Sequence, residues 1–115
     1  MKLPNADRAE VDIRKLRDYC LDPNSPKGRN KARVFKAALG LTRNDASLLR
    51  DELLSAARER ACELGEVDDY GQRYTLDFQL ETAAGRHQVR SGWMVRHDED
   101  FPRLTTCYVV VSKAS

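Results

Sequence analysis

The chain has 115 residues, of which 41% are hydrophobic and 33% charged, and its 20 basic and 18 acidic residues give a formal net charge of +2. This composition excludes a disordered chain, and the length fits one domain over residues 1–115. The charge is too balanced to indicate nucleic-acid binding from totals alone, so such a function would have to come from local clusters.

Cysteine usage and hydropathy exclude further classes of protein. The three cysteines, Cys20, Cys62 and Cys107, are widely spaced and form no CxxC pair, so we expect small buried side chains rather than disulfides or a zinc site. No apolar segment follows Met1, and no apolar run approaches the length of a membrane span. We therefore expect a cytoplasmic protein that does not associate with membranes and uses neither a metal nor a cofactor.

Three helices are predicted in the first half of the chain. The first covers about residues 12–21, with Asp12 as its N-cap and one apolar stripe formed by Ile13, Leu16 and Cys20. Prolines and a glycine within 22–28 predict a loop, after which a second helix covers about 29–39. A third helix covers about 45–64 and is followed by an acidic turn.

After Gly71 the spacing of the apolar residues changes from the helical period to strict alternation. This alternation predicts strands over about 73–82, 86–96 and 103–112. The third of these is apolar on both faces and is predicted to be the central strand. Helices followed by strands predict an α+β fold, with three helices packed on one face of a three-stranded, or four-stranded, antiparallel sheet.

The second predicted strand carries a row of arginines. Arg86, Arg90 and Arg96 share parity, whereas Val89 and Trp93 have the opposite parity and are predicted to face the core. The arginines would therefore lie on the sheet face that the helices leave open, where guanidinium groups could bind phosphates. The alternative is a solvated face whose charge is balanced by the neighbouring strand, through Asp77, Gln79 and Glu81.

A second basic cluster lies where the second helix begins. Lys27, Arg29, Lys31 and Arg33 fall within seven residues. A helix start offers free N–H groups and a partial positive charge, so this segment is a candidate anion site. It lacks the order of a P-loop, and the alternative is a solvated charged turn.

The chain contains two histidines, His87 and His97, and neither has the spacing of a metal ligand. His87 is the candidate for proton transfer near neutral pH. The alternative for His87 is a hydrogen-bonded histidine at the edge of the core. His97 lies in an acidic turn and is expected to be exposed.

Four segments carry a family resemblance: PxGxxKARVF at 26–35, YGxR at 70–73, RSxW at 90–93 and FPRLTTCY at 101–108. In combination they resemble an uncharacterised bacterial family of domains of about this size. The resemblance implies a module that occurs alone or at the C-terminus of large, toxin-like secreted proteins. Many members carry His-Pro where this chain has Ser25-Pro26, which would bear on activity if that histidine is catalytic.

The layout is also similar to the barnase–EndoU–colicin–RelE class of small ribonucleases. That similarity implies N-terminal helices on an antiparallel sheet whose open, basic face cleaves RNA without metal. Arg90 and Lys31 would then hold phosphate and stabilise developing charge, with His87 moving protons. Further contacts to RNA are expected from the remaining cations, which are Lys27, Arg29, Arg33, Arg86, Arg96 and Arg103.

Two functions therefore follow from the sequence. The first is a toxin-like domain that binds or cleaves RNA and is paired with an acidic neutralising protein. The second is a non-catalytic module that binds a protein by strand addition or forms a homodimer.

Overall fold

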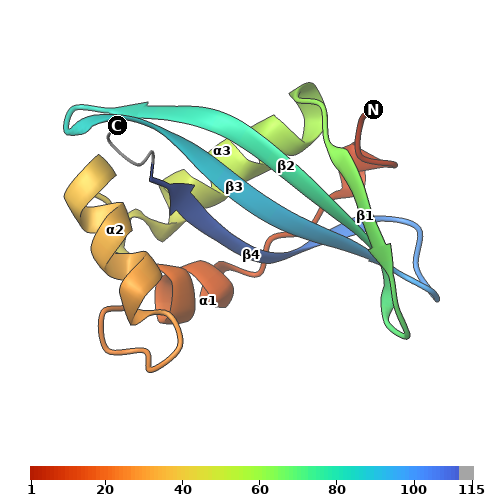
Figure 1. Ribbon diagram of the computed structural model, residues 1–115, viewed down its shortest axis with the longest axis horizontal. Coiled ribbons are helices and arrows are strands. Elements are labelled where there is room, and N and C mark those ends of the chain that lie inside the picture. The colour runs from red at the N-terminus through yellow and green to blue at the C-terminus, as the bar shows by residue number, and fades with distance from the viewer. Residues whose placement is uncertain (112–115) are drawn as a thin grey trace.

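The computed structural model describes residues 1–111, in which helices precede a four-stranded antiparallel sheet (Figure 1). The helical elements are η1 (Ala6–Arg8), α1 (Ile13–Lys15), η2 (Leu16–Cys20), α2 (Arg29–Leu39), η3 (Arg43–Asp45) and α3 (Ala46–Glu59). The strands are β1 (Glu63–Val67), β2 (Gly71–Thr82), β3 (Gly85–Arg96) and β4 (Pro102–Val110). The predicted α+β class is confirmed.

The first predicted helix consists of α1 and η2, which follow one another without a break. Asp12 caps it as predicted, because its Oδ1 accepts a hydrogen bond of 3.0 Å from the Arg14 N–H. The η2 segment is a π-helix, in which the Leu21 N–H donates to the Leu16 carbonyl over 2.8 Å. This wider turn places Tyr19 and Cys20 beside β4 and α2, which η2 contacts.

The boundaries of α2 were predicted correctly, and Gly40 follows it in the left-handed conformation with φ 68°. The prediction for the third helix was wrong at its C-terminus, because α3 ends at Glu59 and residues 63–67 form β1. Arg60 is already extended, and the Cys62 N–H donates to the Met1 carbonyl over 2.7 Å. Burial of Cys62 therefore turns the chain away from the helix axis and into the sheet.

The strand order is β1-β2-β3-β4, so the prediction that the last strand is central was wrong. Figure 1 shows β4 at one side of the sheet with α1 and α2 beside it, and α3 behind β2 and β3. Two backbone hydrogen bonds tie Glu10 to β4, at 2.9 Å to Pro102 and 3.0 Å to Leu104. The helices and the segment around Glu10 cover the edge strand β4, which explains why β4 is rich in apolar residues. The end predicted for this strand, Ser112, lies outside the described residues.

The core lies between the helices and the sheet face of Leu76, Val89 and Trp93. The facing helix residues are fully or almost fully buried: Leu16, Phe35, Leu49 and Leu53. Ser91 is a buried polar residue on this face, and it accepts from Trp93 Nε1 at 2.9 Å while donating to the Leu76 carbonyl at 2.7 Å. The predicted core face of β3 is therefore confirmed. None of the helices within residues 1–111 is both long and apolar enough to cross a membrane.

Candidate functional site

The three arginines of β3 lie on the open face, as their parity predicted, but they are far apart. In the β2–β3 register Arg86 is opposite Glu81, Arg90 opposite Asp77 and Arg96 opposite Gly71. At roughly 3.3 Å per residue, the ten residues between the two ends of this row span about 33 Å. One phosphate cannot contact all three, so each arginine has to be considered with its own neighbours.

Arg90 is held in one orientation by the strand beside it. Its Nε and Nη2 donate to the two carboxylate oxygens of Asp77, each over 2.9 Å, and Gln88 Nε2 donates to Asp77 Oδ2 over 2.7 Å. The Asp77 carboxylate, and after it the neighbouring Tyr108 hydroxyl, raise the pKa of Arg90. A guanidinium has five N–H groups, so three remain for a ligand, and the side chain is 41% exposed.

Lys31 approaches the same region from α2. Its Nζ donates to the Tyr19 hydroxyl over 3.1 Å and lies 5.1 Å from the centre of the Tyr19 ring. The hydrogen bond to Tyr19 raises the pKa of Lys31, and the nearby Tyr108 contributes in the same direction. Lys31 is half-buried, so α2 holds a positive charge against β4.

Tyr108 lies beside Arg90. It is the β4 residue directly opposite Arg90, and on a sheet opposite residues share a face. The charge of Lys31 of α2 acts on the same phenol from nearby, while its hydrogen bond goes to Tyr19. Tyr108 is not among the site residues predicted from the sequence, although it lies in the FPRLTTCY segment. We call Arg90, Lys31 and Tyr108 the phenol cluster.

Two buried thiols lie near this cluster, each next to a tyrosine in the sequence. Cys20 follows Tyr19, Cys107 precedes Tyr108, and both thiols are free and fully buried. The facing thiol of Cys107 lowers the pKa of Cys20 to about 7, opposed by burial and assisted by the charge of Lys31. The pKa of Cys107 is raised well above its usual value, by Cys20 and by burial. The pair therefore releases its first proton at a lower pH than an isolated thiol does.

The structure does not bring His87 to the phenol cluster. His87 is opposite Leu80 in the register and has the parity of Val89, which places it on the face that the helices cover. Its ring lies near Gly85, in the hairpin that follows β2. Its predicted role as proton carrier beside Arg90 therefore has no geometric support.

The cations of the predicted helix-start cluster separate as well. Lys31 is half-buried, whereas Lys27, Arg29 and Arg33 are exposed. At about 100° per residue, Arg33 points about 200° around α2 from Lys31 and so lies on the far side of the helix. Ser25, at the position where the resembling family often has histidine, accepts a hydrogen bond of 3.2 Å from the Gly28 N–H and caps the loop.

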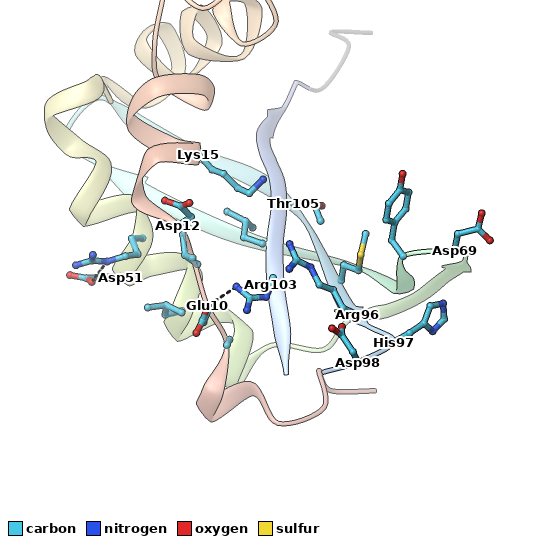
Figure 2. Close-up of a pocket in the computed structure, with 17 residues that line it drawn as sticks. Glu10, Asp12, Lys15, Asp51, Asp69, Arg96, His97, Asp98, Arg103 and Thr105 are labelled. Carbon is cyan, nitrogen blue, oxygen red and sulfur yellow. Dashed lines mark hydrogen bonds and ion pairs between the residues drawn. The ribbon is translucent and has the colours of Figure 1, made fainter. Parts of the chain in front are cut away.

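Arg96 and Arg103 lie at the opposite end of the open face, beside a groove of about 1210 Å³ (Figure 2). Arg103 donates to Glu10 over 2.7 Å and, through two nitrogens, to Glu99 over 2.7 Å each. Arg96 lies 3.9 Å from Glu99. The groove contains carboxylates as well as cations, and Figure 2 shows Asp12, Asp51, Asp69 and Asp98 around it. Arg103 therefore joins the N-terminal segment to β4 rather than offering a free charge.

The charges of the open face are thus largely balanced, which is the alternative that the sequence left open. Arg73 also pairs with a carboxylate, at 2.6 Å from Asp68. Within residues 1–111 no group of three or more His, Cys, Asp or Glu side chains could hold a metal ion. We take the phenol cluster as the candidate site, because there a cation of β3 and a cation of α2 lie near a phenol hydroxyl.

Comparisons with known proteins identify the fold and the family. A solved structure of a contact-dependent growth inhibition toxin–immunity protein complex from Klebsiella pneumoniae 342 contains a chain of similar fold, with a TM-score of 0.70 and 15% sequence identity over 93% of this chain and 97% of that chain. Among curated proteins the sequence has no match. Residues 2–111 match the family described as a domain of unknown function, DUF6883. Because that match spans nearly the whole sequence, the chain belongs to the DUF6883 family.

Proposed function

We propose that this domain is a toxin that binds and cleaves RNA at the phenol cluster without using a metal ion. The observation that supports this most strongly is the position of Tyr108, which lies opposite Arg90 on a sheet face without a helical cover and has the charge of Lys31 nearby. A neutralising partner protein and a cytoplasmic target belong to the same proposal. The chain of similar fold belongs to a complex of a toxin with an immunity protein, which supports a role in such a pair.

The geometry suits a phosphodiester as the substrate. The free N–H groups of Arg90 and the ammonium of Lys31 can bind two non-bridging phosphate oxygens from different sides. RNA supplies its own nucleophile: the 2′-hydroxyl loses its proton to water and attacks phosphorus, the bond to the 5′-oxygen breaks, and a 2′,3′-cyclic phosphate forms. The protein has to stabilise charge at phosphorus and give a proton to the leaving 5′-oxygen. Tyr108, which lies opposite Arg90, takes the role of proton donor to the leaving 5′-oxygen that His87 cannot reach, and its hydroxyl regains a proton from solvent.

Asp77 and Gln88 act as positioning residues for this reaction. Arg90 donates two hydrogen bonds to Asp77, and Gln88 donates one to the same carboxylate, so the plane of the guanidinium is fixed before a substrate arrives. Such preorganisation is what makes a charge effective in a transition state. Asp77 also offsets the charge of Arg90, so the site depends on geometry more than on excess positive charge.

The test is cleavage of a labelled single-stranded RNA by the purified protein and by two matched variants. Arg90→Gln should reduce the rate by about 10²-fold, the usual loss when one transition-state donor is removed. Arg86→Gln removes the same charge from the same face of the same strand and should change the rate by less than about twofold. Equal losses in the two variants, or no cleavage by the unmodified protein, would disprove the enzymatic proposal.

The second candidate function, a protein-binding module, is favoured by one separate observation. All five side chains of the edge strand β1 are exposed, including Leu64 and Val67, and the nearby Tyr70 is 71% exposed. An uncovered strand edge with apolar side chains can accept a strand from another molecule. Light scattering on the purified protein and on Leu64→Lys tests this. A dimer that dissociates in the variant, combined with absent RNA cleavage, would favour the module.

A further inference from the structure

A groove lies on the outer side of α2, away from the phenol cluster. It has a volume of about 750 Å³ and lies between α2, the residues that follow η2 and the connection from α2 to η3. Leu21, Ala37 and Leu41 contribute apolar surface to it, and the charged residues that line it are all cations: Arg33, Lys36 and Arg43.

The charge of this groove is less balanced than that of the open face. Arg43 pairs with Asp18 over 2.9 Å, but within residues 1–111 no carboxylate forms an ion pair with Arg33 or Lys36. Both side chains are exposed and project from the same side of α2, because they are three residues apart. A ligand that supplies carboxylates would therefore gain charge complementarity that the chain itself does not provide.

The walls of the groove favour a protein over a nucleic acid. Proteins that bind single-stranded nucleic acid stack the bases on aromatic side chains, and no aromatic side chain lines this groove. Aliphatic walls beside cations instead match a segment with an aliphatic anchor residue and flanking Asp or Glu. We propose that the groove on the outer side of α2 binds an acidic segment of the neutralising partner protein.

This inference rests on the proposed partner, but it uses residues distinct from the phenol cluster. Lys31 and Arg33 point to opposite sides of α2. An acidic segment of the partner can therefore occupy the groove without itself contacting Tyr108. Recognition of the partner and binding of RNA are then separable by mutation.

The experiment selects a displayed library of 12-residue peptides on the folded protein and measures the affinity of the enriched peptides by anisotropy. The test variant is Lys36→Glu with Ala37→Glu, which cancels the net positive charge of the groove by changes at two exposed positions. The control variant is Arg58→Glu with Ala61→Glu, which makes the same change in charge at exposed positions at the end of α3 and just beyond it. Thermal unfolding confirms that both variants fold.

We expect enriched peptides to combine Asp or Glu with an aliphatic residue. Their affinity should fall at least about tenfold in the test variant and stay unchanged in the control. Amide chemical shifts of the unmodified protein should move within residues 32–44 when such a peptide binds, which locates the site independently of any variant. RNA cleavage by the test variant should stay within about twofold of the unmodified rate.

Three results would overturn the inference: no enrichment of acidic peptides, peptides that bind both variants equally, or a parallel loss of RNA binding in the test variant. The third would make the groove part of a nucleic-acid surface. Groove-dependent peptide binding by a protein that does not cleave RNA would retain the docking site and remove only the proposed ribonuclease activity.

Discussion

At the scale of single residues, the thiol of Cys20 reports on the electrostatics of the site. Its pKa is lowered to about 7, and the nearby charge of Lys31 is one of the causes. We expect thiolate absorbance near 240 nm to develop around pH 7 in the folded protein. Lys31→Met should move this transition to higher pH, and Cys20→Ser should remove it.

The same pair sets a dependence of stability on pH. Between about pH 7 and the usual thiol pKa, folded Cys20 binds fewer protons than the unfolded chain does, so the free energy of unfolding should rise with pH in this window. Above the usual thiol pKa the raised pKa of Cys107 reverses the sign, and stability should fall. Urea titrations of the unmodified protein and of Cys20→Ser measure this. A transition that begins only above the usual thiol pKa would contradict the lowered pKa of Cys20.

Several residue positions could be predicted from the sequence because a strand has a strict period of two. The parity of Arg90 and Trp93 placed one on the open face and the other in the core. The pairing of Arg90 with Asp77 follows from the two-residue loop at Ala83 and Ala84, which fixes the β2–β3 register. Tyr108 could not be placed in this way, because the β3–β4 register shifts by one residue between Gly92 and Trp93.

At the scale of elements, the contact between η2 and the loop before α2 positions Tyr19 and, through Tyr19, Lys31. A Cβ on Gly28 would lie 1.9 Å from the Tyr19 carbonyl oxygen, so only glycine permits this approach of loop and π-helix. We expect Gly28→Ala to lower the free energy of unfolding by about 1–3 kcal/mol, as overpacking usually does. It should also slow RNA cleavage, because Tyr19 orients Lys31.

Chemical denaturation and the cleavage assay measure the two effects of this substitution. Asn30→Ala, an exposed change in the first turn of α2, is the control and should leave both within error. Unchanged stability in Gly28→Ala would show that the loop and η2 move independently.

The boundaries of elements show where local sequence signals are overridden by packing. The second helix was predicted to the residue, because prolines precede it and Gly40 ends it. The C-terminus of α3 was missed, since residues 60–64 continue a helical pattern and only the burial of Cys62 in the tertiary structure turns the chain. β1 was not predicted, because its first residues continue the helical pattern. All of its side chains are exposed, so it also lacks the apolar alternation that is typical of a strand.

At the scale of the whole molecule, the net charge is only +2, so any electrostatic attraction of RNA has to come from local clusters of cations. If Arg90 and Lys31 together neutralise one phosphate, a plot of log K against log salt for single-stranded RNA should have a slope of about −0.7, the value expected per neutralised phosphate. Anisotropy titrations at several salt concentrations give this slope. A slope steeper than about −4 would mean that the wider set of arginines also contacts RNA.

The central claim is that Arg90 and Lys31 act together on one phosphate, and a double-mutant cycle on RNA cleavage tests it most directly. The cycle compares the unmodified protein with Lys31→Met, Arg90→Gln and the variant that combines both. We predict that the combined variant is little slower than either single variant, which corresponds to a coupling energy of at least about 1 kcal/mol. If the two losses multiply instead, the residues act independently and the phenol cluster is not one site.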